Sequence, residues 1–223
     1  GVARGLWVRL GEIAEERLKD DARAAEAYEK ALEQAAGEDA ERTILEALDR
    51  LQERLKNHKQ LADVLERRLA FGNDAEQADL HYRIGKLHIH VFEEPQAGHG
   101  SMRQAIEKNP SHAGAREELE KLTAKASMFE EVAETLESVY RAAGDNRALA
   151  GLFEKRIGFA ESPSDRLRLR LDLARVLEDR AVGPALVAGD DFDHLEGAAL
   201  PGHHDFFPSV HVHIKERQVL ERG

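Results

Sequence analysis

The chain has 223 residues, no cysteine and a formal net charge of −11. This acidic balance argues against a nucleic-acid binder, which needs a basic face for phosphates. The lack of cysteine excludes disulfide scaffolds, thiol catalysis and cysteine-based zinc sites. No apolar run approaches the roughly 18–20 residues of a membrane-spanning helix, so we expect no membrane partner. Without an initiator methionine or a signal peptide, the chain is expected to be a cytoplasmic fragment of a longer protein.

The first predicted elements are two helices joined by a short polar link. Apolar residues at positions 6, 7, 10, 13, 14 and 18 follow the 3.6-residue period of a helix, and a second such stripe begins at Ala24. Asp20-Asp21 separates the two stripes, which predicts a helical hairpin. The same pattern continues and predicts helices over residues 5–19, 22–36, 40–56, 59–71, 75–92, 97–108, 112–125, 128–143, 146–160 and 164–181.

Polar and glycine signals mark the ends of several predicted helices. Asp74, with Gln77 three residues on, indicates an N-cap and its capping-box partner. Ser162-Pro163 places a proline at the first helical position after a capping serine. Gly144-Asp145 supplies a helix stop followed by a new cap.

An internal repeat connects these helices. Leu10-Gly11 returns as Ile84-Gly85, and Tyr28 as Met102, after a shift of 74 residues. Residues 61–71 return as residues 149–159 after a shift of 88. Self-similarity on this scale predicts stacked helical hairpins, in which each hairpin leaves an apolar face that its neighbour covers. We therefore expect the core to run along the array.

The repeated residues resemble a known family. Trp7-x-x-Leu10-Gly11-x-x-Ala14, followed by Ala24-x-x-x-Tyr28, resembles the tetratricopeptide repeat (TPR), although the first unit has one extra residue in its turn. The second copy closes with Asn109-Pro110, where the family usually has its proline. The resemblance covers roughly residues 5–182 and is typical of the long TPR arrays of large bacterial proteins. It implies an all-α fold, a right-handed α-solenoid of antiparallel helical hairpins.

The resemblance also implies a function and a binding surface. TPR arrays bind another protein or a peptide, so we expect a non-enzymatic protein–protein interaction scaffold without a cofactor. The family's groove positions fall on Glu12 in the first unit, on Tyr82, Lys86 and His90 in the second, and on Arg168 and Arg175 in the last. These residues predict a mixed, weakly polar groove; the other interpretation of each is a solvated helix face.

The last part of the chain departs from the repeat. After the array at residues 1–183, residues 184–223 lose the helical stripe and hold five of the 11 histidines, with a strand-like alternation over residues 210–214. One interpretation is a metal site, with His203, His204, His211 and His213 as candidate ligands. The others are a short disordered terminus and a chain that has left its ancestral reading frame.

Three functions therefore remain open. The first is the interaction scaffold, and the second is a zinc-binding or hydrolytic module in the histidine-rich tail. The third is a structural spacer inside a larger chain. The sequence has no Gly-rich phosphate loop, no G-x-S-x-G elbow and no H-E-x-x-H motif, which favours a protein without catalytic chemistry.

Overall fold

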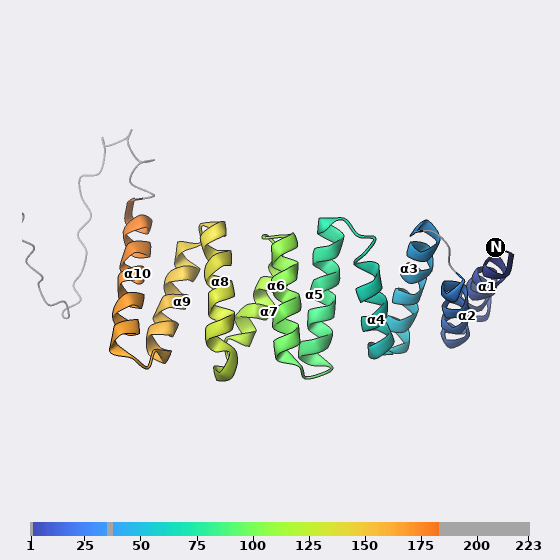
Figure 1. Ribbon diagram of the computed structural model, residues 1–223, viewed down its shortest axis with the longest axis horizontal. Coiled ribbons are helices and arrows are strands. Elements are labelled where there is room, and N and C mark those ends of the chain that lie inside the picture. The colour runs from blue at the N-terminus through green and yellow to red at the C-terminus, as the bar shows by residue number, and fades with distance from the viewer. Residues whose placement is uncertain (1, 35–37, 183–223) are drawn as a thin grey trace, which may run out of the picture. The chain divides into compact units, whose positions relative to one another are not determined.

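The computed structural model describes residues 2–34 and 38–182, and most of these residues are helical. Within these residues there are ten α-helices and no β-strand. The ends of the helices lie within three residues of the predicted ones, except that the first α-helix ends at Ile13, six residues before the predicted end. The all-α prediction is confirmed. The helices are α1 (Val2–Ile13), α2 (Asp21–Glu33), α3 (Glu38–Leu55), α4 (His58–Arg68), α5 (Asp74–His90), α6 (Pro95–Lys108), α7 (Ala113–Leu122), α8 (Phe129–Ala143), α9 (Asn146–Phe159) and α10 (Pro163–Val182) (Figure 1).

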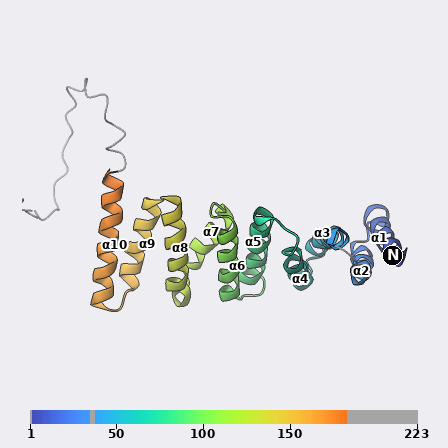
Figure 2. The ribbon, with the colours of Figure 1, turned by 45° about the horizontal axis from the view of Figure 1, so that its top comes forward.

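Consecutive helices pack against one another along the whole described part. Each helix from α1 to α9 contacts the next one in the chain, and α5 also reaches α7 while α6 reaches α8. Both ribbon views show this order (Figures 1 and 2). Because the connections are short, neighbouring helices run antiparallel. The fold is therefore an α-solenoid of helical hairpins, as the repeat predicts.

Equivalent glycines make the same contact in two copies of the repeat. A Cβ atom added to Gly11 would lie 2.8 Å from Cζ of Tyr28. One added to Gly85 would lie 2.8 Å from Cε of Met102. Both distances are too short for a real Cβ atom, so glycine lets the first helix of each hairpin lie directly against a large side chain of the second. The shift of 74 residues in the sequence is thus a repeat in three dimensions.

The extra residue in the first repeat is absorbed by a π-helical turn. Ala14–Leu18 continues α1 with the wider π geometry, and the backbone N–H of Asp20 donates to the carbonyl of Ala14 at 3.0 Å. Lys19 then ends the helix in the left-handed region, with φ of 55°. A π turn accommodates one inserted residue without breaking the helix. The predicted continuous helix over 5–19 is therefore correct in extent, although its last turn is not α-helical.

The helix caps confirm most of the predicted turn signals. Gly144 has φ of 64°, and the Asp145 carboxylate accepts from the Ala148 N–H at 3.0 Å. Ser162 Oγ accepts from the N–H of Asp165 at 3.0 Å. The predicted cap of α5 is wrong by one residue, because Asn73 is the extended residue before the helix and forms the capping box with Glu76.

The buried apolar side chains form three clusters rather than one continuous core. One joins the end of the first hairpin to α3, a second joins α4 to α5, and the third extends from α6 to α10. The first also includes Val64 of α4, so the first two clusters both reach that helix. Asp49 of α3 is buried, with its carboxylate against Arg68 of α4 and Arg83 of α5. The core therefore runs along the array as a series of neighbouring clusters, and charged side chains also connect α3 to α4 and α5.

Some predictions fall on residues outside the described ranges. The tail 184–223 lies there, with the candidate ligands His203, His204, His211 and His213. Among the helices that are described, none is both long and apolar enough to cross a membrane.

Candidate functional site

Three of the predicted groove residues lie together on α5, facing α7. Tyr82, Lys86 and His90 are spaced by four residues and so share one face of the helix. The Tyr82 ring lies 4.8 Å from the His112 ring at the start of α7. Nε2 of His90 lies 2.7 Å from Oε2 of Glu118, near the end of α7. The spacing in the sequence thus found one side of a surface that is built from two helices.

Tyr82 is the centre of this surface. Its ring lies against the backbone of Gly114, where an added Cβ would come within 2.8 Å of Cζ. The ammonium of Lys86 lies 5.4 Å from the ring centroid, within the range of a cation–π contact. Lys86 is exposed and forms no ion pair with any residue in the described ranges. The surface therefore offers a fixed aromatic ring beside an available cation.

The two histidines of this surface hold helices in place. Nδ1 of His112 accepts from the Ala115 N–H at 3.0 Å and caps α7, so Nε2 carries the proton and donates to Asp79 at 3.1 Å. Neither ring nitrogen of His112 is left to act as a base. Burial opposes ionisation of Glu118, but hydrogen bonds from Lys121 and His90 outweigh it and lower its pKa. These contacts fix the position of α7 relative to α5.

Two hollows lie along the rest of α7. The first has a volume of about 400 Å³ and lies between α7 and α8; the second, of about 290 Å³, lies between α7, α8 and α9. The first is lined by Pro110, Ser111, His112, Ala113, Arg116, Glu117, Glu120, Val139 and Ala143. The second is lined by Glu120, Thr123, Leu136, Tyr140, Ala148, Gly151, Leu152 and Lys155. We refer to the two hollows and the Tyr82–Lys86–His90 face together as the α7 groove.

A polar ridge, formed by Arg116 and Glu120, separates the two hollows. Arg116 Nε donates to Glu120 Oε1 at 3.0 Å, and Arg116 Nη2 donates to Asp145 Oδ2 at 2.8 Å. The guanidinium lies 4.8 Å from the ring centroid of Tyr140, whose hydroxyl donates to Glu120 Oε1 at 2.9 Å. Burial and the hydrogen bond to Glu120 raise the pKa of Tyr140. The ridge is therefore held in place before any ligand arrives.

The other three predicted groove residues are not brought to this surface. Glu12 on α1 pairs with Arg9 at 2.8 Å. On α10, Arg168 lies 3.8 Å from Asp165, and Arg175 lies 3.2 Å from Asp172. Each of these contacts lies within a single helix and on an exposed face, as expected of solvated residues.

The sequence interpretation missed the residues that shape the hollows. Arg116 and Glu120 form a polar stripe on α7 with a spacing of four residues, and this signal was available. Ala143 and Gly151 carry no such signal, because small residues are common throughout the helices.

The described residues contain no group of three or more histidine, aspartate or glutamate side chains that could hold a metal ion. The candidate metal ligands of the sequence all belong to the tail, outside these ranges. What the α7 groove offers chemically is two partly apolar hollows, a polar ridge and an exposed lysine beside an aromatic ring.

Comparison with known proteins gives a structural likeness alone. No family model matches this chain, and no curated protein sequence matches it. Two crystal structures of MamA are similar in structure, each at 18% sequence identity and a TM-score of 0.44. The similarity covers 80% of this chain and 94% of MamA in the first, and 77% and 96% in the second. Because the TM-score is low, the assignment of the fold rests on the helices and their packing.

Proposed function

We propose that this protein is a non-enzymatic protein–protein interaction scaffold that binds a segment of another protein in the α7 groove. The observation that carries the proposal is the pair of neighbouring hollows along α7, with a fixed polar ridge between them. Val139 and Ala143 form an apolar floor in the first hollow, and Leu136, Tyr140 and Leu152 do so in the second. Apolar pockets with a polar rim are the usual anatomy of protein interfaces.

The order of the ridge supports binding by a preformed surface. Arg116, Glu120 and Tyr140 are already held by hydrogen bonds to one another. Binding of a partner therefore costs little side-chain entropy at the ridge, and preorganisation of this kind raises affinity. The proposal includes membership of the TPR family, in an array of the long bacterial type. The Gly11–Tyr28 and Gly85–Met102 contacts support it, because they place the motif residues where the repeat requires a close approach.

The proposal also includes the sequence predictions about catalysis, the partner, the location and the cofactor. The engaged nitrogens of His112 and the structural pairing of His90 with Glu118 support a surface without catalytic chemistry. The expected partner is a protein or peptide rather than nucleic acid or a membrane, in the cytoplasm and without a cofactor. The alternative of a zinc-binding or hydrolytic module concerns residues 184–223, which lie outside the described ranges.

A phage-displayed library of random dodecapeptides, panned on the full chain, tests the proposal. Ala143→Phe fills the first hollow, while Ala142→Phe adds the same side chain at the adjacent exposed residue of α8, which does not line it. We expect the enriched peptides to bind Ala143→Phe about tenfold or more weakly and Ala142→Phe as tightly as the unaltered chain. The proposal is wrong if panning enriches no peptide. It is also wrong if substitutions in both hollows leave the affinity of the enriched peptides unchanged.

A further inference from the structure

On the basis of the proposed function, we infer that the second hollow is a specificity pocket that takes an aromatic side chain of the partner next to an acidic residue. The pocket lies where α7, α8 and α9 meet, on the far side of the Arg116–Glu120 ridge from Tyr82. The size of the pocket favours the aromatic side chain, and the charges at its mouth favour the acidic neighbour.

The hollow has room for an aromatic ring. Leu136 and Leu152 are buried beneath the hollow, and the ring of Tyr140 is nearly as buried. Gly151 on α9 leaves the wall open, since an added Cβ would meet no atom within 4 Å. The hollow has a volume of about 290 Å³. A cavity of about 150 Å³ is enough to hold benzene in a protein core, so a phenyl ring has room here.

The charges at the mouth favour an acidic neighbour. Glu120 lines the pocket, but its carboxylate already accepts from Arg116 Nε and from the hydroxyl of Tyr140. Thr123 Oγ1 is also occupied, donating to the backbone carbonyl of Glu120 at 2.6 Å. Lys155 is exposed and has no ion pair with any residue that the structure describes. The charge that remains available at this mouth is therefore positive, and it complements a carboxylate beside the bound ring.

Three pools of synthetic peptides test the inference on the full chain. The pools share random flanks and differ at two adjacent central positions, which are Phe-Glu, Ala-Glu or Phe-Lys. We expect the Phe-Glu pool to bind about tenfold tighter than either of the others, measured by fluorescence anisotropy. Equal binding of the three pools would overturn the inference.

Filling the pocket should remove the preference for phenylalanine. Gly151→Leu places a side chain in the hollow, whereas Gly158→Leu makes the same change on α9 at a second open glycine that does not line it. Gly151→Ala, which meets no neighbour, shows by its melting temperature that a side chain at this position is compatible with the fold. If Gly151→Leu still prefers Phe-Glu to Ala-Glu, the pocket is assigned to the wrong place.

Reversing the charge should reverse the preference for glutamate. Lys155→Glu is expected to favour the Phe-Lys pool over the Phe-Glu pool, and a loss of folding alone would not produce such a switch. Lys125→Glu, at another exposed lysine outside both hollows, should leave the preference unchanged. If the preference fails while peptides sensitive to Ala143→Phe are still selected, the pocket inference falls and the scaffold proposal stands. If no pool and no library peptide binds, both fall.

Discussion

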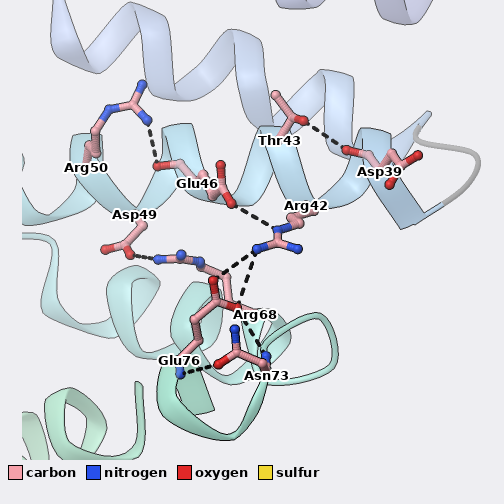
Figure 3. Close-up of polar contacts among 9 residues, drawn as sticks. All are labelled: Asp39, Arg42, Thr43, Glu46, Asp49, Arg50, Arg68, Asn73 and Glu76. Carbon is pink, nitrogen blue, oxygen red and sulfur yellow. Dashed lines mark hydrogen bonds and ion pairs between the residues drawn. The ribbon is translucent and has the colours of Figure 1, made fainter. Parts of the chain in front are cut away.

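Asp49 on α3 and Arg156 on α9 are buried charges of opposite sign, with 4% and 7% of their surfaces exposed. Asp49 is held by Arg68 of α4 and Arg83 of α5, so its carboxylate links three helices; Figure 3 shows the contact with Arg68. Arg156 is held by Glu130 and Glu137, both on α8, so its guanidinium links two. The charges of the two clusters are reversed. In the first, one carboxylate lies between two arginines, and in the second, one guanidinium lies between two glutamates.

The clusters differ in how completely they are satisfied. Arg83 donates two parallel hydrogen bonds to Asp49, from Nη1 to Oδ2 at 2.7 Å and from Nη2 to Oδ1 at 2.6 Å. Arg156 uses its two terminal nitrogens on Glu137 and Glu130, while its Nε is buried without a partner in the described structure. A buried donor left unpaired costs about 1–3 kcal/mol. We therefore expect Arg156 to stabilise its region less than Asp49 does.

The two charged clusters also differ in the helices that they connect. Around Asp49, a further ion pair connects α3 to α5, between Arg42 and Glu76 at 3.2 Å (Figure 3). Arg156 lies beside the apolar cluster that continues from α6 to α10. Charged contacts thus link α3 to α4 and α5 in the first region and α8 to α9 in the second.

The largest effect is expected for Asp49→Ala. It would leave Arg68 without its carboxylate partner and Arg83 with Glu53 alone, at 3.1 Å. Because the two arginine side chains are 26% and 30% exposed, water compensates part of the loss, and we expect a cost of about 2 kcal/mol. Asp63→Ala, at an exposed residue of α4, should change stability by less than about 0.5 kcal/mol. Urea unfolding measures both, and a cost for Asp49→Ala similar to that of Asp63→Ala would contradict the role given to this cluster.

A smaller effect, of about 1 kcal/mol or less, is expected for Arg156→Met. The carboxylates left behind are not stranded, because Glu130 has 60% of its side chain exposed and Glu137 also accepts from Arg141 at 2.9 Å. The change also removes the unpaired Nε. Arg147→Met, at an exposed residue of α9, is the matched control in the same urea experiment. A cost equal to that of Asp49→Ala would remove the distinction between the two regions.

A comparable effect at a partly exposed pair isolates the contribution of burial. Asp145 also pairs with an arginine, but its side chain is 31% exposed and it caps α9. Asp145→Ala should cost about 1 kcal/mol, and Asp145→Asn less, since asparagine can still cap the helix. A cost for Asp145→Ala as large as that of Asp49→Ala would show that burial is not the deciding factor.

The same residue predicts a pH dependence. The hydrogen bond from the Ala148 N–H and the pairing with Arg116 lower the pKa of Asp145 in the folded state. Its contribution is therefore present above the unfolded pKa of about 3.9 and is lost as the pH falls through the folded value. The difference in unfolding free energy between the unaltered chain and Asp145→Ala should shrink between neutral pH and about pH 3. A difference that grows on acidification would contradict this sign.

Part of the candidate site follows from local spacing and part does not. Tyr82, Lys86 and His90 share a face because they are four residues apart, and the structure places that face against α7. Glu12 and Arg175 came from the same family pattern, yet each pairs within its own helix. The position of a residue in a repeat fixes its face on the helix, but the contacts of that face depend on the neighbouring helices.

The sequence by itself determined the ten helices and their pairing into hairpins, because helical periodicity, caps and short connections act over a few residues. Only the tertiary structure decided that Asp49 and Arg156 are buried, that the core divides into three clusters and that two hollows open along α7. Ala143 lines a hollow and the adjacent Ala142 does not, although the two have the same side chain. The difference arises from which helix faces come together, and that is a property of the packing.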